Sequence, residues 1–138
     1  MTAVYSVDVA ITAPVEDTEV TARVADAVRH LFPEADPTHR DGELAAEVHT
    51  MEGFSEELHR AEILDTARSV FFDNLAGDSF SFDLKKQAAF EGRVNFAVGE
   101  PAELGDIHVE VTVQEPDAES YIDYVAPPTE DGTPVDPE

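Results

Sequence analysis

The chain has 138 residues and carries 31 acidic residues against 8 lysines and arginines, which gives a formal net charge of −23. This length fits one domain with a sizeable core, and a hydrophobic content of 42% argues against a disordered chain. The absence of cysteine excludes a disulfide framework and a thiolate zinc site. No run reaches the ~18 apolar residues of a membrane span. The start does not resemble a signal peptide, so we expect a cytoplasmic protein without membrane contact.

The acidity also bears on the solvent in which the protein works. A charge of this size repels itself strongly in dilute salt, whereas the Debye length falls to ~3 Å at ~1 M salt and screens the repulsion. Only two lysines accompany many aspartates, glutamates, alanines and valines. This composition predicts an extreme halophilic archaeon, and the alternative is a mesophilic acidic protein that binds basic partners.

The first third of the chain predicts a strand, a helix and a hairpin. Apolar and polar residues alternate over 5–11, which indicates a half-buried strand that Pro14 ends. A helix follows, with Asp17 or Thr18 as its N-cap and Pro33 after its end. The apolar face of this helix comprises Val20, Val24, Ala27, Val28 and Leu31. Asp41-Gly42 predicts a hairpin turn that leads into a strand over 44–49.

The longest periodic segment begins after Gly53. Ser55 is a suitable N-cap residue, and apolar residues recur at helical spacing from Leu58 to Leu75. We expect a break in this helix near Glu62 and an end at Gly77, because glycine adopts the left-handed conformation common after a helix.

The last part of the chain predicts three strands, one helix and a tail. Alternation predicts strands over 80–84, 94–98 and 107–113, and the segment 87–90 forms either one helical turn or a bulged connection. A short helix over 118–125 closes the domain. We therefore expect one domain over 1–125 and an acidic, proline-rich tail over 126–138 that packs poorly.

This order of elements predicts an α+β fold. Strands beside two amphipathic helices suggest a two-layer sandwich with a mainly antiparallel sheet and helices packed on one face. The other face of the sheet then lies in solvent or meets a partner. The polar positions expected on that face are Ser6, Asp8, Ala97, His108, Glu110 and Thr112.

No pattern in the chain indicates catalysis. The five histidines have no metal-ligand spacing, and the chain contains no phosphate-binding glycine loop and no nucleophile elbow. The carboxylates are too numerous for any acid–base pair to stand out. We expect no enzyme, no cofactor and no metal.

One stretch of the chain is not acidic. Residues 79–98 contain three basic and two acidic residues, so their net charge is +1, and the other 118 residues have 5 basic and 29 acidic residues, or −24. Lysine and arginine neutralise phosphates, whereas glutamine and asparagine bond to phosphates, sugars or base edges. The candidate RNA-binding residues are Lys85, Lys86, Gln87, Arg93 and Asn95. The alternative is that these lysines pair with neighbouring carboxylates or protect a sheet edge.

Three strings of the chain resemble those of a known family. They are FSEELHRAEILDTARSVFF, GDSFSFDLKKQAAFEGRVNF and LGDIHVEV. They are similar to an archaeal family of uncharacterised proteins described as RNA-binding, whose fold is like that of the large-subunit ribosomal protein that binds 5S ribosomal RNA. Lys86, Gln87 and Gly92 match the most distinctive polar string of the family. The resemblance covers about residues 4–125, implies a ribosome or RNA-metabolism role, and supplies no catalytic residues.

Two functions remain open from the sequence, and an unrecognised enzyme is a third and weaker alternative. The first is a non-enzymatic RNA-binding domain. The second is a protein–protein adaptor, or an oligomeric structural domain without nucleic-acid affinity, that meets a partner or a second copy through the face or edge of its sheet.

Overall fold

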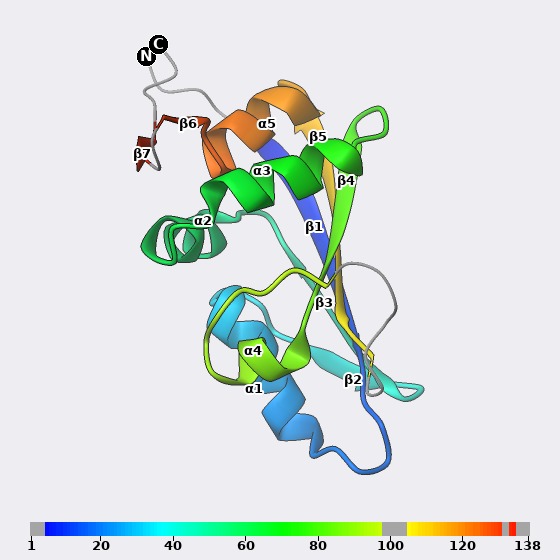
Figure 1. The fold of residues 1–138 in the computed structure, drawn as a ribbon. Coiled ribbons are helices and arrows are strands. Elements are labelled where there is room, and N and C mark those ends of the chain that lie inside the picture. Colours follow the sequence, from blue (N-terminus) through cyan, green and yellow to red (C-terminus); the bar gives the residue numbers. More distant parts are fainter. Residues whose placement is uncertain (1–4, 98–104, 131–132, 135–138) are drawn as a thin grey trace.

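The computed structural model describes residues 5–97, 105–130 and 133–134. Its elements in chain order are β1 (Ser6–Pro14), α1 (Thr21–Leu31), β2 (Thr38–Arg40), β3 (Glu43–Val48), α2 (Glu52–Arg60), α3 (Leu64–Asp73), β4 (Ser79–Leu84), α4 (Lys86–Phe90), β5 (Ile107–Glu115), α5 (Ala118–Val125), β6 (Thr129–Glu130) and β7 (Thr133–Pro134). The five longer strands form one antiparallel sheet in the order β2-β3-β1-β5-β4, and β6 pairs with β7 (Figure 1).

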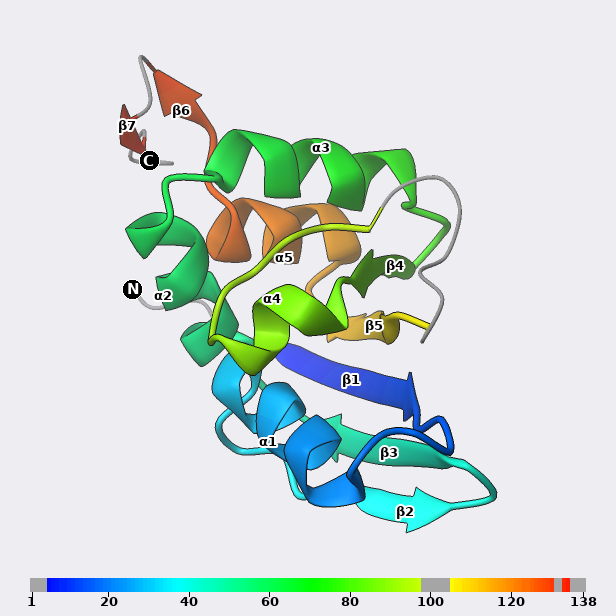
Figure 2. The same cartoon turned by 60° about the horizontal axis from the view of Figure 1, so that its bottom comes forward.

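The sheet and the helices form two layers, which confirms the predicted α+β class. Helices α1 to α5 lie on one side of the sheet (Figures 1 and 2). On the central strands, residues facing the helices are buried and their neighbours are not: Val109 and Val111 are fully buried, whereas His108 and Glu110 are exposed. The predicted period-two pattern therefore separates a core face from an open polar face. The likeness to the ribosomal protein stays a prediction.

Phenylalanine rings fill the space between the layers. Phe54 of α2 stacks on Phe32 and on Phe82 of β4, with ring centroids 5.1 and 5.3 Å apart. Phe71 of α3 packs on Phe80 and Phe82 at 5.0 and 4.9 Å. All five rings are buried. Removing such a buried ring typically costs about 3–5 kcal/mol, so this cluster holds α2 and α3 on the edge strand β4.

Two local predictions are confirmed by backbone conformation. Asp41 and Gly42 have φ angles of 52° and 80°, as the two-residue turn between β2 and β3 requires. Glu62 has a φ of 57° and lies between α2 and α3. This left-handed residue ends one helix and redirects the chain into the next, so the expected long helix is broken where predicted.

Two helix starts differ from the prediction. Helix α1 begins at Thr21 with Val20 as an N-cap that makes no side-chain bond, so neither Asp17 nor Thr18 caps it. Val20 adopts an extended backbone before the first turn, and it is 59% exposed rather than part of the core face. Helix α2 begins at Glu52, three residues before the expected cap, and Ser55 lies inside the helix, where its hydroxyl donates to the Val125 carbonyl at 2.7 Å.

Two further boundaries also differ. Helix α3 ends at Asp73, and Gly77 with a φ of 62° forms the turn before β4. The strand expected over 94–98 is reduced to one bridge between Phe96 and Leu84, and Val98 lies outside the described residues. Val94 and Phe96 are nevertheless buried, so the alternation indicated side-chain burial rather than a ladder of strand pairs.

The first residues of the predicted tail contact the domain. Ala126 is fully buried, and Thr129 donates to the Asp65 carboxylate of α3. Residues 131–132 and 135–138 lie outside the described part, so the boundary at 125 stays a prediction. In the described part of the chain, no helix has the length and apolar character needed to cross a membrane.

Candidate functional site

Lys86 does not lie on the surface where the sequence placed it. Its side chain is 4% exposed and donates to Glu19 Oε1 at 2.8 Å and to the Pro14 carbonyl. The Glu19 side chain is 6% exposed, so this ion pair is buried between α4 and the segment that precedes α1. The five predicted residues therefore do not form one accessible patch.

The other four predicted residues are exposed but differ in their surroundings. Arg93 pairs with Glu91 at 2.8 Å, and the side chain of Lys85 lies in solvent. The backbone N–H of Lys85 donates to the Asn95 carbonyl, which places both beside the Leu84–Phe96 bridge. Gln87 lies on α4 and lines a surface hollow. Whether these four contact RNA stays a prediction.

That hollow lies between α1 and α4, and we call it the α1–α4 hollow. Its volume is about 290 Å³, and it continues into a smaller one of about 170 Å³ that shares Arg23 and Phe90. The two together are lined by Thr18, Glu19, Val20, Arg23, Val24, Asp26, His30, Gln87 and Phe90. The Arg23 guanidinium lies over the Phe90 ring, 5.5 Å from its centroid. A guanidinium over a ring is a flat, partly apolar platform next to the amide of Gln87.

Sequence reasoning missed both members of this platform. Arg23 lies on the exposed side of α1, and Phe90 ends the single turn of α4. No local pattern pairs them, because only the packing of α1 against α4 brings them together. Val20, which the sequence pattern placed on the apolar face of the helix, lies exposed at the rim of the hollow and could not be recognised as such from the sequence.

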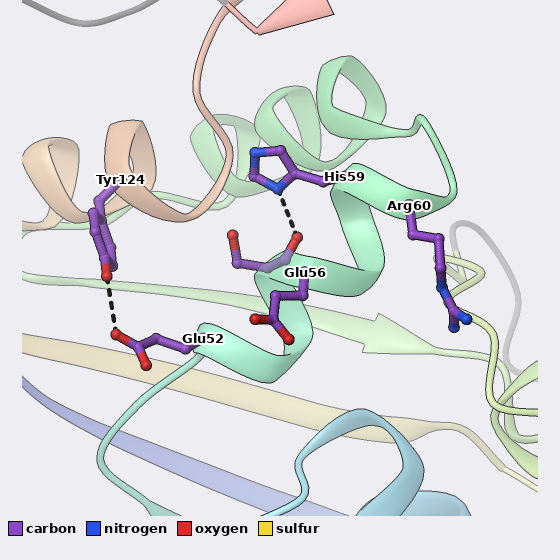
Figure 3. A pocket seen from close by; sticks show the side chains of 6 residues that line it. Glu52, Glu56, His59, Arg60 and Tyr124 are labelled. Carbon is purple, nitrogen blue, oxygen red and sulfur yellow. Dashed lines mark hydrogen bonds between the residues drawn. The ribbon is translucent and has the colours of Figure 1, made fainter.

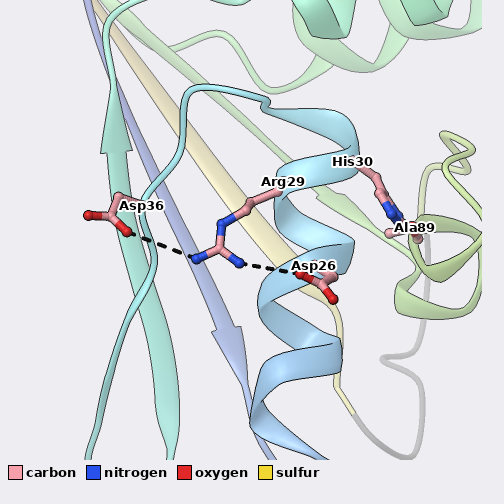
Figure 4. Close-up of polar contacts among 5 residues, drawn as sticks. All are labelled: Asp26, Arg29, His30, Asp36 and Ala89. Atoms are coloured by element: carbon pink, nitrogen blue, oxygen red, sulfur yellow. Dashed lines mark hydrogen bonds and ion pairs between the residues drawn. The ribbon is translucent and has the colours of Figure 1, made fainter.

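Polar contacts on α1 tie this helix to its neighbours. Arg29 lies between Asp26 and Asp36, at 3.3 and 3.9 Å, and His30 Nδ1 lies 2.9 Å from the Ala89 carbonyl of α4 (Figure 4). Carboxylates neutralise Arg29 in place, so it is poorly available to phosphates. His30 joins the two walls of the hollow.

A second hollow, of about 760 Å³, lies on α2 beside α5, and we call it the α2–α5 hollow. It is lined by Glu52, Ser55, Glu56, His59, Arg60 and Tyr124. Tyr124 is 46% exposed and donates to Glu52 Oε1 at 3.1 Å. The Arg60 side chain extends away from the Tyr124 ring (Figure 3). Carboxylates beside an exposed aromatic ring suit a cationic group rather than a phosphate.

The Tyr124 ring belongs to a tyrosine cluster. It stacks on Tyr5 with centroids 4.7 Å apart, and Tyr5 lies 5.2 Å from Tyr121. Burial raises the pKa of Tyr121, whose hydroxyl accepts the Met51 N–H. Burial and the Glu52 carboxylate also raise the pKa of Tyr124. These hydroxyls stay protonated near neutral pH, so they do not act as bases.

The open face of the sheet carries two histidine–aspartate pairs. His108 Nδ1 lies 2.7 Å from Asp83 Oδ1, and His49 Nδ1 lies 3.1 Å from Asp8 Oδ1. The hydrogen bond to the Val7 carbonyl is the largest cause that raises the pKa of His49; desolvation lowers this pKa, and the Asp8 and Glu47 carboxylates raise it further. This face, predicted to meet solvent or a partner, therefore has strongly polar character.

The fold is shared with solved structures of archaeal proteins. A crystal structure of a UPF0201 protein from Methanococcus jannaschii matches with a TM-score of 0.87 and 32% identity, over 94% of this chain and 99% of that one. A second UPF0201 crystal structure matches with a TM-score of 0.82 and 31% identity. A DUF54 protein from Archaeoglobus fulgidus, 22% identical with a TM-score of 0.67, shares the fold. No family model matches the chain.

Curated relatives agree with the solved structures. UPF0201 proteins from Sulfurisphaera tokodaii and Aeropyrum pernix are each 35% identical, over 88% and 94% of this chain and 88% and 91% of their own lengths. The chain therefore belongs to the archaeal UPF0201 family. A UPF0200/UPF0201 protein from Archaeoglobus fulgidus is 34% identical over 94% of this chain. The chain spans only 40% of that relative and 52% of one from Methanopyrus kandleri.

Proposed function

We propose that this chain is a non-enzymatic RNA-binding domain of the cytoplasm of a salt-adapted archaeon, and that it holds unpaired bases in the α1–α4 hollow. The observation that carries this proposal is the Arg23–Phe90 platform inside the hollow. Proteins that bind single strands commonly stack bases on aromatic rings and on arginine planes.

The charge of the chain favours base stacking over phosphate binding. With 31 acidic and 8 basic residues, phosphates meet a repulsive field. Arg29, Arg93 and Lys86 already pair with carboxylates. Each phosphate contact on a single strand also makes affinity fall with salt, with a slope of about −0.7. Stacking contributes about 1–3 kcal/mol per base and does not depend on net charge.

Polar side chains at the rim would give the hollow its preference among bases. Gln87 lines the hollow and is exposed, and its amide is both a donor and an acceptor for a base edge. Lys85 is exposed two residues earlier and can reach a flanking phosphate. Of the residues proposed from the sequence, these two remain the strongest candidates for contact.

The test is binding of fluorescently labelled single-stranded RNA, measured by anisotropy at ~0.2 and ~2 M potassium chloride, where screening differs strongly. Phe90→Ala should weaken binding by about 1–3 kcal/mol per lost stack. Tyr124→Ala removes another exposed ring outside this hollow and should leave binding unchanged. Equal affinity of the parent and Phe90→Ala, with folding verified, would refute the site.

A protein partner is the second candidate function, and a relative provides the observation that favours it. The Archaeoglobus fulgidus relative is named for two families, and this chain corresponds to 40% of it. Fusion of two domains raises their effective concentration, as is useful for parts that act together. The α2–α5 hollow, with Tyr124 beside Glu52 and Glu56, suits a basic segment of such a partner.

Recovery of complexes from native cells separates the two candidates. Crosslinking at native salt, followed by ribonuclease treatment, should release proteins that were bound through RNA. Protein that stays bound after ribonuclease and is lost from Tyr124→Ala would favour the second candidate.

A further inference from the structure

Three side chains that commonly bind metals meet on the open face of the sheet. Asp8 lies on β1, Glu47 on β3 and His49 directly after β3. One donor atom from each residue lies within 4.8 Å of the other two. We propose that these residues hold a borderline divalent cation of the zinc class between β1 and β3.

The register of the sheet brings the three residues together. In the antiparallel pair, Val9 lies opposite Val48 and Ala10 opposite Glu47. Because side chains alternate along a strand, Asp8, Glu47 and His49 leave the sheet on the side opposite the buried Val9 and Val48. The strand ladder and the core therefore fix the backbone beneath the site, and a cation need not order a loop to bind.

The interatomic distances fit shared coordination. His49 Nδ1 lies 3.1 Å from Asp8 Oδ1 and 3.1 Å from the Val7 carbonyl oxygen. Both neighbours of Nδ1 are acceptors, so this nitrogen donates a hydrogen bond, and a cation would bind in place of the shared proton. Zinc binds nitrogen and oxygen at about 2.0–2.2 Å in a tetrahedron, so two of its ligands are about 3.4 Å apart. The 3.1 Å between Nδ1 and Asp8 Oδ1 is within a few tenths of an ångström of this separation, and the donor atoms of all three residues lie within 4.8 Å of one another.

A neighbouring strand orients one of the ligands. Gln114 of β5 donates to Asp8 Oδ2 at 2.7 Å, which leaves Oδ1 facing His49. Such outer partners typically change metal affinity by 10–100-fold. Among the described residues, neither Asp8 nor Glu47 pairs with a lysine or arginine. A cation would therefore relieve a repulsion that no lysine or arginine of the described residues neutralises.

The donor set selects the kind of cation. A ring nitrogen with carboxylate oxygens suits zinc, cobalt or nickel, whereas magnesium and calcium prefer oxygen alone. The nitrogen donor distinguishes this site from a purely acidic cluster. The remaining coordination positions face solvent, because His49 is 69% exposed at its side chain.

Calorimetric titration of the full chain with zinc chloride tests the proposal. At ~1 M potassium chloride, diffuse attraction to the acidic surface is screened, and one saturable site per chain is expected. His49→Ala and Glu47→Gln should each weaken it at least ~10-fold, and Gln114→Ala about 10-fold. His108→Ala is the matched control, because this histidine lies on the same face and pairs with the single carboxylate of Asp83.

Three outcomes would overturn the proposal: no saturable binding, equal losses in His49→Ala and His108→Ala, or complete displacement by equimolar magnesium. Nuclear magnetic resonance of ¹⁵N-labelled histidine rings in the unchanged chain gives a test that needs no variant. The His49 ring signals should shift first as zinc is added. If another histidine shifts first, the assignment to these three residues is wrong.

Discussion

Two pairs of neighbouring helices, α1 with α4 and α3 with α5, are held by ion pairs of different exposure. Helix α4 is held near α1 by the Lys86–Glu19 ion pair, whose side chains are 4% and 6% exposed. Helix α3 is joined to α5 by Arg68–Asp123 at 2.6 Å, whose side chains are 28% and 45% exposed. The same kind of interaction is thus buried in one pair and open to water in the other. Burial decides how much each contributes to stability, and which basic residues stay available to a ligand.

The largest expected effect is the loss of the buried pair. Lys86→Met keeps most of the apolar stem but leaves Glu19 charged and buried, which should lower the free energy of unfolding by about 3–5 kcal/mol. Urea unfolding measures the change. The comparison variant is Arg68→Met, which breaks the more exposed pair and should cost about 1 kcal/mol.

A double variant separates the pair from simple packing. Lys86→Met with Glu19→Gln removes both charges, so much of the lost stability should return. If Lys86→Met alone is no more costly than Arg68→Met, the difference between the two helix pairs does not lie in burial of charge.

Short-range patterns in the sequence predicted most of the secondary structure but little of the candidate site. Alternation in β5 and the helical spacing of α5 depend on residues two to four positions apart, so short-range patterns predicted both. Lys86 was predicted to contact RNA, with pairing to a neighbouring carboxylate as the alternative; its observed partner Glu19 is distant in sequence and becomes a neighbour only when α4 packs near α1. The Arg23–Phe90 platform has the same tertiary origin. Contacts between segments that are distant in the sequence were therefore not predicted at the candidate site.

A smaller effect is expected from salt, which acts on the whole charged surface. Self-repulsion from a net charge of −23 is screened as potassium chloride rises from ~0.1 to ~3 M. The melting temperature should rise by more than about 4 °C, the shift that ~1 kcal/mol produces in a domain of this size. Calorimetry at each salt concentration measures it. A flat or falling melting temperature would contradict adaptation to high salt.

Salt also sharpens the contrast between the two ion pairs. The coupling energy of Arg68 with Asp123, from a double-mutant cycle, should shrink in concentrated salt because water and ions reach this pair. The coupling of Lys86 with Glu19 should stay nearly constant. Equal salt sensitivity would mean that the buried pair is as accessible as the exposed one.

The smallest effect is expected at the end of the domain, beside the exposed pair. Truncation after Pro127 removes Thr129 and its exposed bond to Asp65, so the free energy of unfolding should fall by no more than about 0.5 kcal/mol. Truncation after Val125 also removes Ala126, which is fully buried and whose carbonyl accepts from Arg68 at 3.2 Å. That shorter chain should lose about 2–4 kcal/mol more, from the buried side chains of Ala126 and Pro127 and a charge-assisted bond. Urea unfolding of both truncated chains locates the end of the domain. If the chains that end at Val125 and at Pro127 are equally stable, the domain ends at 125. If only the chain that ends at Val125 loses stability, the domain ends at 127.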